Sequence, residues 1–342
     1  MGEPTGSIQS LKTQISRWEN GKVTPDAFHR KLLRSVLGVS DEALGFTSAT
    51  TTMDARPPAL AQALTNASLA AVGSVDQLRQ KLAVLRRTDG QQGATQLLDY
   101  GRGLLREVTQ QRRYLARASE RRALAAETAG LASLVGWQSL DLGDVDSAWT
   151  AYEEAKAAAR EAEDSALLAH TSAEQSFTLL DLGRGRDAAD MVADARTRPG
   201  LPPRLVAWLY AAEAECLAAA GDASAARAAL NAAELALPAS DDDAALTPYL
   251  RLDAVNLARW RGHSLSRLQD PGAVGELLAG LGDVRGRFGR AEAGVLVDLA
   301  AAEVHRRHTE EARQYLRAAR AAANRAGSVR QHRRLEAITA AA

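Results

Sequence analysis

The sequence contains very little cysteine and few aromatic residues. One cysteine, Cys216, stands among 342 residues, which excludes an intramolecular disulfide and a metal site built from several thiolates. Aromatic residues make up 4% of the chain against 46% for all hydrophobic residues, so alanine and leucine supply most of the apolar surface. Because both favour helices, and few stretches alternate with β-branched or aromatic residues, we expect an all-α fold.

The chain also lacks an excess of charge of either sign and any long apolar run. It carries 42 basic and 42 acidic residues, which argues against a protein that binds polyanions over its whole surface. It contains neither a basic-then-apolar leader nor a run of about 18 apolar residues, so we expect no signal peptide, no membrane partner and a cytoplasmic location. Locally the balance differs, because residues 8–39 hold six bases against two acids.

Residues 14–22, Gln-Ile-Ser-Arg-Trp-Glu-Asn-Gly-Lys, are the most informative stretch. They read as a short polar helix that ends on an aromatic, an acid and Gly21, which can adopt the left-handed conformation that stops a helix. Amphipathic residues follow over 28–39 and 41–46. Together these segments resemble the recognition-helix end of an Xre-type (phage-repressor/Cro-like) helix-turn-helix. Because only ten residues precede Leu11, we expect residues 1–46 to be a partial domain that lacks its first helices.

The resemblance implies a DNA-reading surface on the first of these helices. In such folds the N-terminal side of the recognition helix meets base edges and phosphates with hydrogen-bonding side chains. That face here offers Ser10, Lys12, Thr13, Gln14, Ser16 and Arg17. Two interpretations stay open. In the first, the half-domain is completed by another chain or by rearranged residues 1–10 and binds DNA. In the second, the start is misplaced or the domain is decayed, which leaves a folded stub that covers the repeats.

Three further regions follow the partial domain. Residues 47–58 form a polar linker that ends on a proline pair, which resists helix formation. Leucine-rich residues 59–118 predict two or three helices, as a cap or dimerisation segment. Residues 119–342 contain an internal repeat.

The repeat is marked by glycines. Gly143, Gly183 and Gly221 each end an amphipathic helix, at steps of 40 and 38 residues, and Gly262 continues the series 41 residues later. Small and apolar residues follow the first three at fixed distances: Ala148, Ala188 and Ala226; Tyr152, Val192 and Leu230; Ala155, Ala195 and Ala233. With Gly136 at a close helix crossing, and a weaker copy after Thr309, this pattern resembles the tetratricopeptide repeat, although its spacing is longer. The resemblance implies an α-solenoid of four to five helix pairs.

The inner face of such a solenoid is a candidate binding groove. Counting back from each turn glycine selects the residues that would face inward: Trp137, Asp141, Phe177, Asp181, Glu215, Asn256, Arg259 and Trp260. Aromatic and polar side chains together would suit a peptide or small ligand. The alternative is that Trp137 and Phe177 only pack between helices.

We interpret the basic segment over residues 306–334 as a solvated helix face.

No arrangement in the sequence predicts catalysis, a metal site or a cofactor. His305 and His308 are three residues apart, but no third ligand falls in register with them. The two resemblances together imply a transcriptional regulator, not an enzyme, that binds DNA through residues 1–46 and senses a peptide, a small molecule or a protein partner in the repeats, with a homodimer as the working unit. The alternative is an interaction scaffold whose truncated N-terminus no longer binds DNA.

Overall fold

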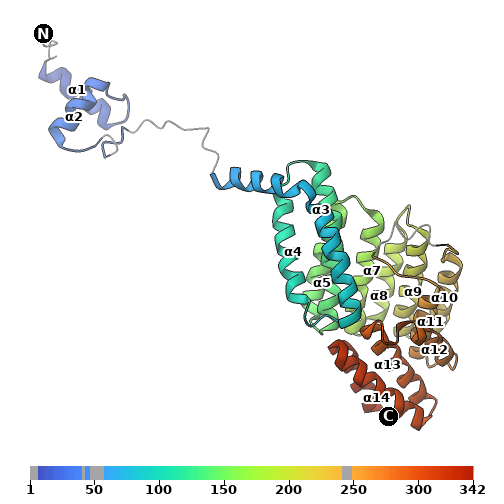
Figure 1. Cartoon of the computed structure of the whole chain (residues 1–342). Coiled ribbons are helices and arrows are strands. Elements are labelled where there is room, and N and C mark those ends of the chain that lie inside the picture. The colour runs from blue at the N-terminus through green and yellow to red at the C-terminus, as the bar shows by residue number, and fades with distance from the viewer. Residues whose placement is uncertain (1–6, 41–42, 47–57, 241–248, 342) are drawn as a thin grey trace. The chain divides into compact units, whose positions relative to one another are not determined.

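The chain folds into two compact units, residues 1–62 and residues 63–342. A computed structural model describes residues 7–40, 43–46, 58–240 and 249–341. All regular secondary structure within those ranges is helical, so the predicted all-α fold is confirmed (Figure 1). No helix in the described part of the chain is long and apolar enough to cross a membrane.

Unit 1 contains two short helices, α1 (Ile8–Glu19) and α2 (Ala27–Leu37). The Asp26 side chain accepts a hydrogen bond from the backbone N–H of His29 and so caps the start of α2. Gly21 has a φ of +65°, as predicted for the residue that stops the first helix. The last amphipathic segment, however, is not helical where it is described, because residues 43–45 form a turn. Residues 41–42 of that segment and residues 47–57 of the predicted linker lie outside the described ranges.

Unit 2 is a row of antiparallel helix pairs preceded by the long helix α3 (Pro58–Gln92) and by α4 (Leu98–Arg113). The pairs are α5 (Ala118–Asp141) with α6 (Val145–Glu161), α7 (Ser165–Asp181) with α8 (Gly185–Arg196), α9 (Pro203–Ala219) with α10 (Ala223–Ala236), α11 (Ala254–Arg267) with α12 (Ala273–Val284), and α13 (Gly289–His305) with α14 (Thr309–Ala326). Helix α15 (Val329–Ala341) follows the last pair. Each helix packs on its partner and on the next pair, so the predicted solenoid-like architecture is confirmed.

The turns between paired helices need a residue with positive φ. Gly143, Gly183 and Gly221 supply it with φ values of +80°, +74° and +79°, as predicted from their spacing. The expected fourth turn glycine, Gly262, is instead inside α11. The turns after α11 and α13 use Gln269 and Arg307, with φ values of +59° and +61°, which L-residues adopt only at a cost.

Small residues are needed where paired helices approach closely. A Cβ added at Gly136 on α5 would lie 3.0 Å from the Tyr152 ring of α6. A Cβ at Gly262 would lie 2.7 Å from Leu277 Cγ and 2.9 Å from the Leu277 backbone nitrogen of α12. Gly262 is therefore a packing residue, and the glycine periodicity in the sequence combined two different physical requirements.

The first helices of the pairs form an inner row that returns to its start. Helices α5, α7, α9, α11, α13 and α15 are neighbours in that order, and α15 also contacts α5. The end of α3 lies against the end of α14. A Cβ added at Gly93, the residue after α3, would lie only 1.9 Å from the carbonyl oxygen of Ala326, the last residue of α14. The C-terminal helices thus lie against the first helices of unit 2 (Figure 1). This return creates a pocket on the inner face.

We predict that Gly262→Ala lowers the free energy of unfolding by about 1–3 kcal/mol, because the new methyl group overpacks a contact with backbone. The matched control is Gly275→Ala on α12, where an added Cβ meets nothing within 4 Å. That change should raise stability by about 0.5–1 kcal/mol, since alanine loses less entropy than glycine in a helix. Urea unfolding followed by circular dichroism compares the two, and equal effects would contradict the packing role of Gly262.

Candidate functional site

A pocket of about 340 Å³ opens on the inner row of unit 2. Its walls come from α5, α9, α11, α12, α13 and α15, with the end of α3 at one side. Aromatic side chains, arginines and a few other polar groups line it: Trp137, Trp260, Phe288, Arg251, Arg259, Arg290, Arg330, Arg334, His263, Glu215, Asp283, Asp298, Asn256 and Gln331. The mixture of flat apolar surfaces with a few convergent charges is the composition of a small-molecule site.

Five of the eight residues selected from the sequence line this pocket. They are Trp137, Glu215, Asn256, Arg259 and Trp260. The two tryptophans are half-buried, as an accessible groove residue should be. Whether these residues bind a ligand stays a prediction.

Phe177 does not line the pocket, because its side chain is only 4% exposed. Its ring lies between two pocket residues, with centroid distances of 6.1 Å to Trp137 and 6.0 Å to Trp260. Trp260 also packs edge-on against Trp208 at 6.2 Å. Phe177 therefore supports the pocket wall from the protein interior. This is the alternative given above, in which Phe177 packs between helices and does not contact a ligand.

Asp141 and Asp181, the other two residues selected from the sequence that do not line the pocket, hold α13 and α15 against the first helices of the row. Arg290 Nη2 of α13 is 2.7 Å from Asp89 Oδ1 of α3, and Arg290 Nε is 3.0 Å from Asp141 Oδ2 of α5. The second contact lacks hydrogen-bond alignment and is an ion pair. Burial by itself would lower the pKa of Arg290, but the two carboxylates outweigh it and raise the pKa.

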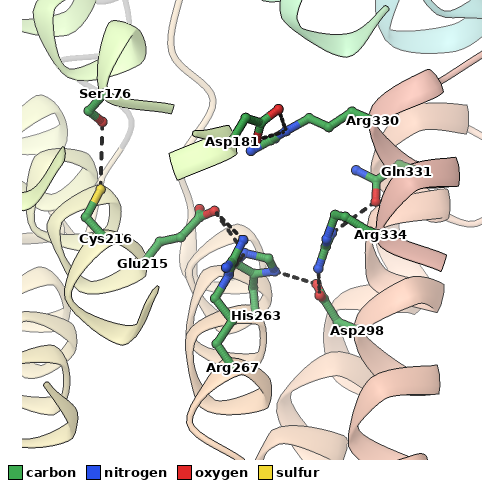
Figure 2. Close-up of polar contacts among 10 residues, drawn as sticks. All are labelled: Ser176, Asp181, Glu215, Cys216, His263, Arg267, Asp298, Arg330, Gln331 and Arg334. Atoms are coloured by element: carbon green, nitrogen blue, oxygen red, sulfur yellow. Dashed lines mark hydrogen bonds and ion pairs between the residues drawn. The ribbon is translucent and has the colours of Figure 1, made fainter. Parts of the chain in front are cut away.

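Helix α15 is fixed through the same aspartates. Ser328 Oγ donates a hydrogen bond to Asp141 Oδ1 at 2.6 Å. Arg330 Nε donates to Asp181 Oδ1 at 2.8 Å, as Figure 2 shows. The interpretation of residues 306–334 as a solvated basic face was therefore wrong for Arg330 and Arg334, which line the pocket. Sequence reasoning missed them because α15 lies beyond the recognisable repeats, and its basic residues look alike until the helix is placed on its neighbours.

A histidine links three helices of the row. His263 Nδ1 of α11 lies 2.6 Å from Asp298 Oδ2 of α13, and His263 Nε2 lies 2.9 Å from Glu215 Oε1 of α9 (Figure 2). Arg334 of α15 also pairs with Asp298. Burial alone would lower the pKa of His263, yet the two carboxylates raise it, and His263 in return lowers the pKa of Glu215 to about 2. An imidazolium that donates to both acids accounts for these two contacts, and the Arg267 guanidinium lies next to them, with Nη2 3.8 Å from Glu215 Oε1.

A second, smaller cavity of about 170 Å³ also has Trp137 in its lining. Its polar groups include Glu174 and His170. Burial raises the pKa of Glu174 to about 7 and lowers the pKa of His170 to about 3. Ser133 donates a hydrogen bond to the Glu174 carboxylate. Because the raised pKa of Glu174 lies near neutral pH, its titration has to be separated from that of His263 in any pH experiment.

Unit 1 presents the predicted DNA-reading side chains on the surface of α1. Ser10, Lys12, Thr13, Gln14, Ser16 and Arg17 are all exposed. Ile15 and Trp18 are half-buried on the opposite side of the helix, with the Trp18 ring 5.1 Å from the His29 ring of α2. Phe28 and Val36 of α2 are 67% and 74% exposed, so unit 1 leaves apolar side chains uncovered within itself.

The molecule thus offers a polar helix face in unit 1 and an aromatic, arginine-lined pocket in unit 2. Comparisons with protein-family models, with curated proteins and with solved structures gave no match. What these two sites bind therefore has to follow from their own geometry and charge.

We predict that stability falls as the pH rises above about 6.5, the usual pKa of an unfolded histidine. Because the folded protein raises the pKa of His263, its charged form contributes in full below that pH and the contribution is lost as pH rises through the folded-state pKa. His263→Gln should remove this part of the pH dependence. It should also lower the free energy of unfolding at pH 6 by about 1–3 kcal/mol, since Glu215 and Asp298 lose a charged hydrogen-bond donor while Arg267 and Arg334 remain beside them.

Urea unfolding at several pH values measures both effects. The control is His305→Gln, a change at an exposed histidine on α13. Glu174 also loses protons up to about pH 7, but it does so in every variant, so the difference between variants isolates His263. An unchanged pH slope in His263→Gln would show that His263 is not the group responsible.

Proposed function

We propose that this chain is a transcriptional regulator in which unit 1 binds DNA and the pocket of unit 2 binds a small-molecule effector. The observation that carries the proposal is the pocket itself, where three aromatic residues and five arginines meet at the closure of the inner row. The DNA-binding half is supported by the charge of residues 8–39, six bases against two acids, and by the exposure of the polar face of α1.

The geometry favours a small effector over a long peptide. Pockets for small molecules measure roughly 300–1,000 Å³, and a volume of about 340 Å³ falls at the lower end of that range. An interaction scaffold that binds extended peptides needs an open inner row. Here Arg330, Gln331 and Arg334 of α15 occupy part of that row. We therefore favour a small effector over the alternative, an interaction scaffold whose inner row binds an extended peptide.

The effector would act by a population shift. A ligand in the pocket contacts both α11 and the closing helices α13 and α15, so it favours the closed form of the row over more open ones. In a homodimer, a change in the curvature of unit 2 alters the distance between the two copies of unit 1. DNA half-sites have a fixed spacing, and the affinity for paired half-sites changes with that distance.

We predict that Arg17→Ala and Lys12→Ala weaken DNA binding by the full chain, because these are the charged members of the exposed α1 face. Loss of a phosphate contact should weaken binding to all sequences and reduce the salt slope by about 1, whereas loss of a base contact should cost about 1–3 kcal/mol at one position of the site. Selection from a random duplex library, followed by titration at several salt concentrations, supplies the measurement.

Lys81→Ala serves as the control, since it removes an exposed base from α3 in unit 2. It should leave the affinity and the salt slope unchanged. If the library yields no enriched sequence, or if all three variants behave alike, unit 1 does not read DNA and the regulator proposal fails.

A further inference from the structure

We propose that the pocket of unit 2 binds a planar aromatic acid, whose carboxylate pairs with Arg259 while its ring contacts Trp260, Trp137 and Phe288. This inference deepens the proposed function and rests on the pocket being an effector site. In this assignment Arg259 and the three aromatic rings bind the ligand, while the other pocket arginines hold the fold together.

Charge pairing within the pocket singles out Arg259. Four of the five arginines that line it each have a carboxylate partner: Arg251 with Asp283 at 3.3 Å, Arg290 with Asp89 at 2.7 Å, Arg330 with Asp181 at 2.8 Å, and Arg334 with Asp298. Arg259 has no hydrogen-bond or ion-pair partner among the described residues. The four paired arginines already have structural roles, so Arg259 is the cation left to meet a ligand.

Arg259 is also held in place and partly removed from water. Its side chain is half-buried, and its Cβ packs against Gly280 of α12, where an added Cβ would lie only 3.0 Å away. Burial, followed by the charge of nearby Arg251, lowers the pKa of Arg259, while Asp283 and Asp253 act weakly against that shift. A guanidinium in this setting gains more from an anion than an exposed one does, because its water shell is already incomplete. Carboxylates match the two parallel N–H groups of arginine.

Aromatic rings beside Arg259 provide flat surfaces for an apolar body. Trp260 is its neighbour in the chain, and Phe288 and Trp137 line the same pocket. Phe177 wedges between Trp137 and Trp260 and limits their rotation. Rings that are fixed before binding lose little entropy when a planar ligand stacks on them.

Among the described residues, two guanidinium groups lie over each of two of these rings, which leaves Trp260 as the ring without one. Arg251 Cζ lies 4.8 Å from the Phe288 ring centroid, and Arg330 Cζ lies 5.7 Å from that of Trp137. These contacts fix the rings in orientation and add positive potential around the pocket. A single unpaired guanidinium matches a monoanion, and the pocket volume suits a small ring system better than a peptide.

The experiment measures binding of 2-naphthoate and of its neutral counterpart 2-naphthamide to the full chain by calorimetry, with benzoate and indole-3-acetate as further acids. We expect the acid to bind the unsubstituted protein at least about tenfold more tightly than the amide, the size of a charge-assisted pair. Arg259→Met should abolish that preference. Arg261→Met is the matched control, because Arg261 lies on the same helix but pairs with Glu234 at 2.7 Å outside the pocket.

Equal affinity for acid and amide, an unchanged preference in Arg259→Met, or no binding of any of the three acids at millimolar concentration would overturn the proposal. Tighter binding of a tripeptide acid than of 2-naphthoate would overturn it in favour of a peptide ligand. DNA affinity is measured separately with and without the acid. Arg259-dependent binding without an effect on DNA would refute the regulator proposal alone, whereas an effect on DNA that persists in Arg259→Met would refute the ligand assignment alone.

Discussion

The architecture of unit 2 depends on one buried ion-pair arrangement, Arg290 between Asp89 and Asp141. It joins α13 to the ends of α3 and α5, and Ser328 at the start of α15 hydrogen-bonds to the same Asp141. Buried charges are costly unless they are paired, and removal of one partner leaves the others uncompensated. The interaction therefore discriminates strongly between the closed row and any arrangement in which the last helices lie elsewhere.

Closure of the row separates three of the five pocket arginines from the other two, of which Arg251 pairs with Asp283. Arg290, Arg330 and Arg334 come from the closing helices α13 and α15, and each pairs with an aspartate of another helix. Arg259 comes from α11, inside the row, and faces the pocket without such a partner among the described residues. A ligand that pairs with Arg259 would thus add to the contacts between α11 and the closing helices, which is the physical link between ligand binding and the shape of unit 2.

The spacing of the glycines predicted the turns between paired helices correctly in some places but not in all. Gly143, Gly183 and Gly221 were predicted correctly as turn residues because glycine adopts positive φ at little cost. Gly262 was assigned the same role but serves a close crossing with α12. A single sequence cannot distinguish these two uses of glycine. It also gave no sign that Gln269 and Arg307 would take up positive φ, since L-residues adopt that conformation only at a cost.

The sequence alone determined the helical class, the order of helix pairs and five of the pocket residues, because helix periodicity and turn residues are local properties of the chain. It also placed six exposed polar residues on α1. The tertiary structure decided that Phe177 supports the wall, that Asp141 and Asp181 hold the closure, and that α15 supplies Arg330 and Arg334 to the pocket. These roles follow from contacts between residues up to 187 positions apart. Such contacts depend on the summed curvature of all the helix pairs, which no local pattern encodes.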